Sequence, residues 1–348
     1  MGPIPLGPWT PLFQGLGFEA DGETIEFDWM GDKIIEWDAG TKEEIWSWDV
    51  FNYFNMEDYD SGLWDNVCAD NGQYDWTHIN AIVFDEEESA IYISTRHLSR
   101  ITKIDYSSKD VVWNMGRDMP SDDVGFGHNL GFSWQHSLQV LNNGNIITLD
   151  NGNRSESFLN TEFPTTRGVE ISVEENNGEY SAEIVWEYNL PEDLFGFASG
   201  NVQKLENGNY LITTVGGGGT VLEVTPGNEI VWQANLNLSL PSGAVYRANR
   251  ISSLYPNISH IEVDCDSNDC CVKSSNNFPS SVTILSGDSC FFKNDLIALN
   301  DIITLNQLSY ETPLHLGTQT WLGGRLRFFV AGNYWGGVES PLSILPES

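Results

Sequence analysis

The stretch "WQHSLQVLNNGNIITLDNGN" (134–153) decides the fold because a near copy, "SGNVQKLENGNYLITTVGGG" (199–218), follows it along the chain. In each copy a short strand-like run leads into an Asn-Gly-Asn turn, and an apolar run follows. Two such runs around an Asn-Gly turn are typical of a β-hairpin. Superimposing the two turns places His136 opposite Gly200, so the copies differ where the first strand begins.

Four other segments share one plan, in which a strand, a polar turn and a second strand end in an aliphatic-Trp pair. They are "KIIEWDAGTKEEIWSWD" (33–49), "RITKIDYSSKDVVWNMG" (100–116), "VEISVEENNGEYSAEIVWEY" (169–188) and "TVLEVTPGNEIVWQAN" (220–235). Further strand pairs lie between them, such as "NAIVFDEEESAIYISTR" (80–96). Units of four antiparallel strands, repeated every ~40–50 residues, indicate a β-propeller. The sequence therefore predicts an all-β fold with a propeller of six, or alternatively five, blades, and tryptophans that fill the space between blades. A β-sandwich is the structural alternative.

The repeat stops after "YPNISH" (255–260), and a cysteine-containing segment follows. The tail "RLRFFVAGNYWGGVESPLS" (325–343) alternates apolar residues and then turns through Gly-Gly, as the last strand of a small β-sandwich would. We therefore expect two domains, a propeller over residues 1–259 and a β-rich, sandwich-like accessory module over residues 260–348.

The charge of the chain restricts its partners. Sixteen Lys and Arg against fifty Asp and Glu give a net charge of -34, which repels polyanions and argues against nucleic acid or an anionic membrane surface. No apolar run approaches the ~20 residues that a membrane helix needs, so membrane insertion is not expected.

Four of the five cysteines fall between Cys265 and Cys290. This density favours disulfides, and hence an extracellular or periplasmic location, although the given chain shows no signal peptide. Zinc is the alternative for the cluster, but a paired C-x2-C spacing is missing.

Several ordered motifs carry a resemblance to a known family. They are "DWTHINAI" (75–82), "STRHLSRITKID" (94–105), "VVWNMG" (111–116), "WQHSLQVLNNGNIITLDNGN" (134–153), "TRGVEI" (166–171), "IVWEY" (184–188) and "YRANRISSLYP" (246–256). Over roughly residues 30 to 256 the chain resembles the bacterial arylsulfotransferases (arylsulfate sulfotransferases).

The resemblance implies a six-bladed propeller whose central funnel binds a phenolic sulfate. A histidine would attack sulfur and pass the sulfuryl group to a second phenol, with no nucleotide donor, cofactor or metal. The resemblance also implies a catalytic arginine that holds the sulfate oxygens. Arg154 is expected in this role and Arg167 is expected to bind substrate; because both match family motifs, the reverse assignment is the alternative. Sulfuryl transfer resembles phosphoryl transfer, in which positioning and charge stabilisation supply most of the catalysis.

The residues themselves point to two catalytic histidines. His78 and His136 each stand just before a run that reads as the innermost strand of its blade, and equivalent positions of neighbouring blades converge on the central axis. These two imidazoles should therefore face one another at the channel. Neutral imidazole is a plausible nucleophile near neutral pH.

Other candidates lie near these strands. Asn80, His128 in the Gly-rich loop "GFGHNLGF", and Arg247 of "YRANR" are expected to bind substrate. His97 is expected to have a packing or strand-terminal role, and Arg250 is expected to make a structural salt bridge.

The chain also departs from the family pattern, which places the nucleophilic histidine one blade after the equivalent of His136. Here Gly200 and Asn201 occupy that place. A secreted propeller that binds a ligand or glycan without catalysis is therefore the alternative function. A metal-dependent hydrolase with His78, His136 and Asp75 as ligands is a third hypothesis, but H-x-E and H-x-H spacings are missing.

Overall fold

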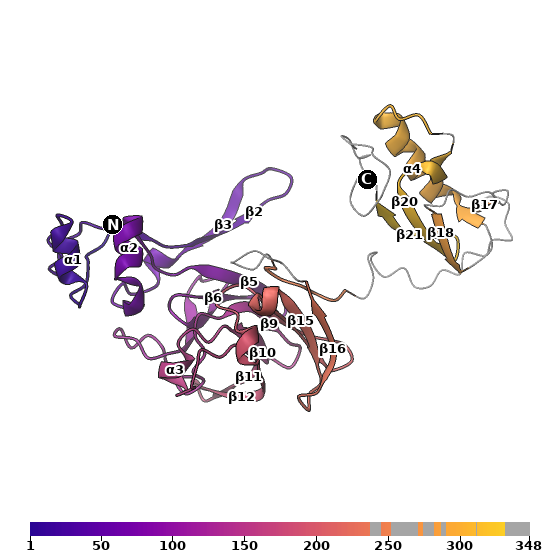
Figure 1. Cartoon of the computed structure of the whole chain (residues 1–348). Coiled ribbons are helices and arrows are strands. Elements are labelled where there is room, and N and C mark those ends of the chain that lie inside the picture. Colours follow the sequence, from indigo (N-terminus) through magenta and orange to yellow (C-terminus); the bar gives the residue numbers. More distant parts are fainter. Residues whose placement is uncertain (237–244, 252–270, 274–281, 287–289, 311, 331–348) are drawn as a thin grey trace. The chain divides into compact units, whose positions relative to one another are not determined.

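The computed structural model describes most of the chain and divides it into two compact units, Met1–Ile251 and Ser252–Ser348 (Figure 1). The described residues are 1–236, 245–251, 271–273, 282–286, 290–310 and 312–330. The predicted boundary between residues 259 and 260 lies outside them, as do Cys265 and Cys270 of the cysteine cluster. The predicted disulfides therefore stay a prediction, and each unit is considered by itself.

Three four-stranded antiparallel sheets dominate the N-terminal unit, and each follows the order of the chain. The first consists of β5 (Ile79–Asp85), β6 (Ala90–Thr95), β7 (Arg100–Asp105) and β8 (Val111–Gly116). The second consists of β9 (His136–Val140), β10 (Ile146–Asp150), β11 (Arg167–Asn176) and β12 (Glu179–Asn189). The third consists of β13 (Asn201–Lys204), β14 (Tyr210–Thr214), β15 (Thr220–Val224) and β16 (Ile230–Asn235). The hairpins predicted within these ranges are confirmed.

The three sheets pack against one another in sequence, with β9 in contact with both β5 and β13. Tryptophans fill the space between neighbouring sheets, as predicted. The ring of Trp113, which is 7% exposed, contacts Tyr180 of the second sheet, and the ring of Trp186 stacks on Tyr210 of the third with centroids 3.4 Å apart. Trp232 differs because it is 46% exposed.

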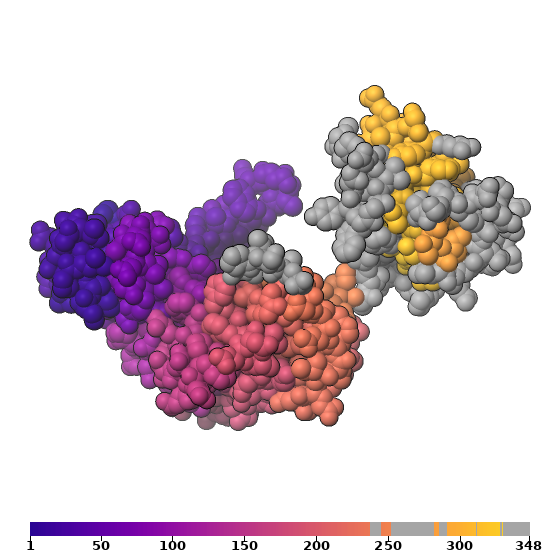
Figure 2. Space-filling view, in the orientation of Figure 1, coloured from indigo at the N-terminus to yellow at the C-terminus, as the bar shows by residue number. Residues whose placement is uncertain are grey.

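The first 78 residues form a different structure from the sheets that follow. A hairpin of β2 (Lys33–Trp37) and β3 (Glu44–Asp49) projects from the surface (Figures 1 and 2). The same part contains α1 (Thr10–Gly15), α2 (Asn66–Asn71), and the parallel pair β1 (Asp28–Met30) and β4 (Gln73–Asp75). Their core is aromatic: Trp64 is fully buried, stacks on Tyr74 and contacts Phe13 and Trp29.

The described residues do not reach the predicted five or six blades. They contain three four-stranded sheets, and the predicted unit at residues 33–49 remains a two-stranded hairpin. The alternation of apolar residues specifies the hairpin, but the flanking segments are short helices and turns that supply no further strands to it. The fold is therefore rich in β-sheet, and a closed propeller remains a proposal.

The C-terminal unit corrects the prediction of a β-sandwich. A 13-residue helix, α4 (Lys293–Leu305), buries Leu299, Ile302 and Ile303 in one core with Trp321. The strands are β17 (Cys271–Lys273), β18 (Val282–Ser286), β19 (Cys290–Phe292), β20 (Thr318–Leu322) and β21 (Arg325–Val330), and β18 pairs with β20 in parallel. Across both units, the described residues also form five short 3-10 helices: η1 (Val50–Asn52), η2 (Ser61–Leu63), η3 (Glu192–Leu194), η4 (Gly216–Gly218) and η5 (Pro313–His315). None of the described helices is both long and apolar enough to cross a bilayer.

Candidate functional site

His78 lies at the junction between the N-terminal part and the first sheet. Strand β4 ends at Asp75, and three residues later His78 precedes β5 with a φ of 52°, in the left-handed region that non-glycine residues rarely adopt. This turn brings Nδ1 of His78 to 2.5 Å from Oδ2 of Asp75, while 44% of the His78 side chain stays exposed. The hydrogen bond to His78 holds the pKa of Asp75 below its usual value, although burial acts in the opposite direction.

The ring of His97 contacts the ring of His78, with the two centroids 4.7 Å apart. Nε2 of His97 accepts a hydrogen bond from the guanidinium of Arg96 at 2.7 Å, so the ring proton resides on Nδ1, which donates to the carbonyl oxygen of Asp75 at 2.5 Å. Burial lowers the pKa of His97 to about 4. This residue, expected to be structural, is therefore a neutral bridge between Asp75 and Arg96.

Asp75, His78 and His97 could offer a metal three ligand atoms within 4.8 Å of one another. Both nitrogens of His97 are engaged, however, and one of them faces a guanidinium, which repels a cation. The hypothesis of a metal site with His136 as a ligand finds no support in this geometry, because His136 does not belong to the group. The arrangement orients imidazoles rather than preparing a cation site.

His136 is the first residue of β9 and is only 4% exposed. Its orientation follows from Asn151, which comes directly after β10. The amide nitrogen of Asn151 donates to the carbonyl oxygens of Gly196 and Ser199, at 2.6 and 3.0 Å, so its Oδ1 must face Nδ1 of His136 at 2.8 Å. Nδ1 of His136 therefore carries the proton.

The other nitrogen of His136, Nε2, is left with a free lone pair. Nothing in the described part of the chain forms a hydrogen bond with it. Burial, more than any other cause, lowers the pKa of His136 to about 4, and the charges of Arg96 and His78 act in the same direction. The ring is thus neutral at neutral pH, with Nε2 unprotonated, as a nucleophile requires.

Trp134 contacts both His97 and His136, and its ring is called the Trp134 shelf. Its carbonyl oxygen lies 3.2 Å from Nδ1 of His136, and its ring lies 5.8 Å from that of His97. Guanidinium carbons of Arg96 and Arg154 lie 4.2 and 5.4 Å from its ring centroid. Asp60 fixes the shelf, since one carboxylate oxygen accepts from the Trp134 indole and the other from Arg154, each at 2.8 Å.

This arrangement can be compared with known proteins. The family model described as Arylsulfotransferase (ASST) matches residues 19–247, which is more than half of the chain. The chain belongs to the arylsulfotransferase family. The resemblance noted in the sequence motifs is thereby confirmed at the level of the family.

Other comparisons add little to the family assignment. No curated protein matches the chain. Among solved structures, it is similar to a protein of unknown function from Bacteroides caccae, with 14% sequence identity and a TM-score of 0.35. The match covers 61% of this chain and 59% of that one, so this arylsulfotransferase-family chain spans less than two thirds of that structure.

Arg154 and Arg167, the two arginines expected from the family resemblance, have different surroundings from each other. Arg154 lies at the Trp134 shelf, paired with Asp60. Arg167 has other partners. It donates hydrogen bonds to Asp150, to Glu187 and to the carbonyl oxygen of Leu130. Because Asp150 also accepts from backbone N–H groups at Ser133 and Gly152, Arg167 supports the loop that carries Asn151.

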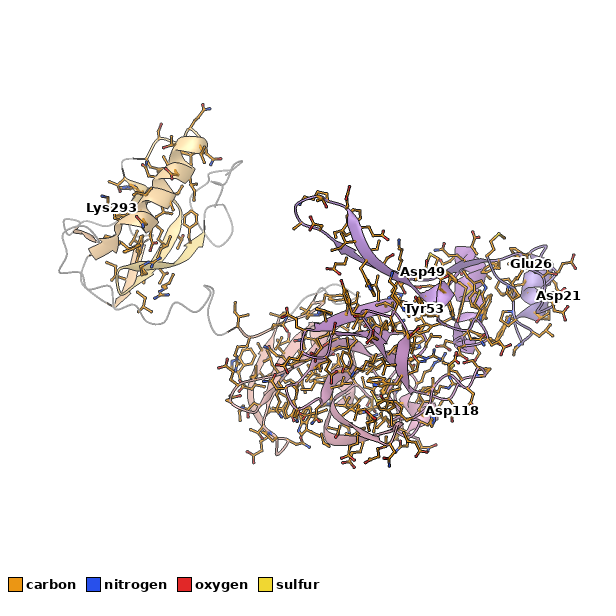
Figure 3. The ribbon with its side chains drawn as sticks, turned by 180° about the vertical axis from the view of Figure 1, so that it is seen from behind. Asp21, Glu26, Asp49, Tyr53, Asp118 and Lys293 are labelled. Carbon is orange, nitrogen blue, oxygen red and sulfur yellow. The ribbon has the colours of Figure 1, made fainter. Side chains whose placement is uncertain are left out.

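The other residues predicted to bind substrate do not share one location. Asn80 and Arg247 lie near His136 or its neighbours, whereas His128 does not. Asn80 donates to the carbonyl oxygen of Gln135, which joins the first sheet to the second next to His136. Arg247 lies over Tyr246, whose ring contacts that of His136 edge-on at 6.3 Å. His128 instead pairs with Asp118, which lies at the periphery of the unit (Figure 3), and lines a depression that contains none of the histidines described above.

Gly200 lies just before β13, and its surroundings leave no room for a side chain. Its φ is 89°, and an added Cβ would lie 2.5 Å from the carbonyl oxygen of Thr213 and 2.4 Å from a methyl carbon of Leu149. No side chain fits there. The next residue, Asn201, is occupied by hydrogen bonds with Ala248, so the third sheet offers no imidazole to the site.

Sequence reasoning missed Arg96, Trp134 and Asn151 as members of the site. A signal was present, because Arg96 follows β6 directly, as Asn151 follows β10. Residues just after the second strand of each unit therefore lie beside the residues that precede the first strand. Arg250, by contrast, makes the predicted salt bridge, with Glu223 at 2.6 Å.

Proposed function

We propose that the chain transfers a sulfuryl group from a phenolic sulfate to a phenolic acceptor, with Nε2 of His136 as the nucleophile. One observation carries this proposal. Asn151 fixes the proton of the buried His136 on Nδ1, which leaves an unprotonated Nε2. Membership of the arylsulfotransferase family supports the class of reaction.

In the first step the lone pair of Nε2 attacks the sulfur of the aryl sulfate. A nitrogen–sulfur bond forms, the bond between sulfur and the phenolic oxygen breaks, and the electron pair leaves with that oxygen. Nδ1–H donates to Asn151, which supports the positive charge that the ring acquires. Because the protonation state is set before substrate binds, no proton has to leave the nucleophile.

His78 is suited to supply a proton to the leaving phenolate. Its Nδ1 lies against the Asp75 carboxylate, which stabilises an imidazolium, and its side chain is 44% exposed, so it can exchange protons with solvent. In the second step the acceptor phenol gives its proton to His78 and attacks sulfur. The nitrogen–sulfur bond then breaks and its electron pair returns to Nε2 of His136.

The aromatic surroundings fit phenolic substrates. The carbonyl oxygen of Trp134 and the ring of Tyr246 contact His136, and the Tyr246 ring can pack against an aryl group. Arg154, whose guanidinium lies at the Trp134 shelf, supplies positive charge near the leaving group in this proposal.

We also infer that the three sheets are consecutive blades of a β-propeller. The contact of β9 with both β5 and β13 supports this arrangement. So do Ala248 and Arg250, which bond to Asn201 and Gln203 of β13 as the start of a next inner strand would. A location outside the cytoplasm remains an inference from the cysteine cluster alone.

Turnover of a chromogenic aryl sulfate with a phenol acceptor tests the function. We expect His136→Ala to abolish transfer and His78→Ala to slow it most for donors with poor leaving groups, because those need protonation most. His315→Asn, in the C-terminal unit, is the control and should behave as the wild type. Undiminished turnover in His136→Ala refutes the mechanism. Saturable binding of the aryl sulfate without any product supports the non-catalytic alternative instead.

A further inference from the structure

Arg96 lies at the Trp134 ring and has no acidic partner among the described residues. Arg100, Arg154 and Arg167 each pair with a carboxylate within 3 Å. Among the described residues, no ion pair within 4.0 Å includes Arg96. The nearby carboxylates are committed elsewhere, Asp75 to His78 and Asp60 to Trp134 and Arg154.

Neutral groups hold the guanidinium of Arg96 in place. One terminal nitrogen donates to Nε2 of His97 at 2.7 Å, the other donates to the carbonyl oxygen of Phe197 at 3.3 Å, and the plane lies 4.2 Å from the ring centroid of Trp134. Arginine has five N–H donors, so three of them remain without a partner in the described structure. The guanidinium of Arg96 is thus held in one orientation, while part of its hydrogen-bond donor capacity remains available for a ligand.

Burial of a charge is costly. The carboxylates of Asp75 and Asp60 reduce this cost for Arg96 without forming an ion pair with it, and an anion in direct contact would reduce it further. Burial lowers the pKa of Arg96 to about 10, so the side chain still carries its charge at neutral pH. The charge of Arg96 also lowers the pKa of His136, although less than burial does. An anion held by Arg96 would therefore lie within electrostatic reach of the nucleophile.

We propose that Arg96, held against the ring of Trp134, is the residue that binds the sulfuryl oxygens of an aryl sulfate. The planar fork of a guanidinium matches two oxygens of a sulfate ester, as it matches those of phosphate and carboxylate. Arg154 is less available, because its guanidinium is anchored to the buried Asp60. The identity of the ligand rests on the proposed function, whereas the anion site itself rests on Arg96.

Binding of p-toluenesulfonate, an unreactive aryl sulfonate, tests the site without turnover. Thermal unfolding of the full chain is followed at constant ionic strength against increasing sulfonate, with neutral p-toluenesulfonamide as the matched ligand. We expect stabilisation by the sulfonate only. Arg96→Gln should weaken its affinity by about ten-fold or more, because charge-assisted hydrogen bonds are lost.

Matched variants make the outcome specific. Arg96→Lys keeps the charge without the fork and should bind with intermediate affinity, which also guards against a folding defect in Arg96→Gln. Arg117→Gln, whose guanidinium lies over Phe158 at the separate depression, should bind as the wild type does. Equal affinity of wild type and both Arg96 variants overturns the proposal, as does a larger loss in Arg154→Gln than in Arg96→Gln.

Donor kinetics separate this inference from the proposed function. If both hold, Arg96→Gln raises KM for the aryl sulfate by a factor similar to the loss in sulfonate affinity. Turnover with an unchanged KM in Arg96→Gln refutes the role of Arg96 and leaves the function intact. Absence of turnover in the wild type, together with sulfonate binding that depends on Arg96, refutes the function and supports the anion site.

Discussion

The buried, neutral state of His136 predicts how the stability of the chain depends on pH. The unfolded chain should titrate this ring near its ordinary pKa of about 6.5, whereas burial lowers the pKa in the folded chain to about 4. As pH falls below about 6.5, the unfolded state therefore binds a proton that the folded state does not. Folding stability contributed by the neutral ring is present above that pH and is lost as pH falls toward about 4.

The size of the effect follows from the shift. One pKa unit corresponds to about 1.4 kcal/mol, so the full shift corresponds to about 3 kcal/mol of the free energy of unfolding. Between about pH 7 and about pH 5, roughly half to two thirds of it, or about 2 kcal/mol, should be lost. The 4% exposure of His136 leaves solvent little opportunity to reduce this cost.

Urea unfolding of the wild type and of His136→Asn at about pH 7 and about pH 5 measures this contribution. Asparagine keeps an N–H donor toward Asn151 but does not titrate. We expect the wild type to lose about 2 kcal/mol more than the variant between the two pH values, whatever the stability of the variant at neutral pH. His315→Asn serves as the control and should follow the wild type. Parallel losses in wild type and His136→Asn would refute a buried neutral imidazole.

Two substitutions test other parts of the fold. Gly200→Ala should destabilise by about 2–4 kcal/mol in chemical denaturation because its Cβ meets Thr213 and Leu149, whereas Gly208→Ala, with a similar φ of 86° and open space around it, should cost only about 1 kcal/mol; equal costs would contradict the steric account. Asp58→Asn, which leaves the fully buried Arg100 without its partner, should cost about 3–5 kcal/mol, and Glu44→Gln in the exposed pair with Lys33 should cost much less. A cost for Asp58→Asn as small as that of Glu44→Gln would show that this pair does not hold the first sheet to the N-terminal part.

The hairpins were predictable because their signal is local. Alternating apolar residues and polar turns specify β11–β12 or β15–β16 without reference to the rest of the chain. The number of sheets was not predictable, because nothing in the segment at 33–49 distinguishes an isolated hairpin from half of a blade. Helix α4 was not predicted because it directly follows β19 and no capping side chain marks its start.

The site was predictable only in part. His78 and His136 stood out because each lies where a first strand begins, and the structure gives each of them an oxygen partner on Nδ1. The roles of Arg96 and Arg167 depend on whether a carboxylate lies nearby. That property depends on which residues strand pairing brings together, such as Arg167 of β11 opposite Asp150 of β10, and no local motif encodes it.

Gly200 illustrates how a missing residue can be informative. From the sequence alone, its place opposite His136 reads as the loss of a nucleophile. The structure shows a backbone that admits no side chain, next to an asparagine that ties the third sheet to Ala248. In the proposed mechanism His136 is therefore the nucleophile itself, and no imidazole from the third sheet is needed.

Trapping the covalent intermediate tests the central claim most directly. The protein is mixed with an aryl sulfate in the absence of a phenol acceptor, quenched at alkaline pH, digested and examined by mass spectrometry. The account predicts a mass increase of one SO3 group on the peptide that contains His136, absent in His136→Ala and removed by adding a phenol. A sulfuryl group found on another residue, or transfer to phenol with His136 unmodified at every time point, would contradict it.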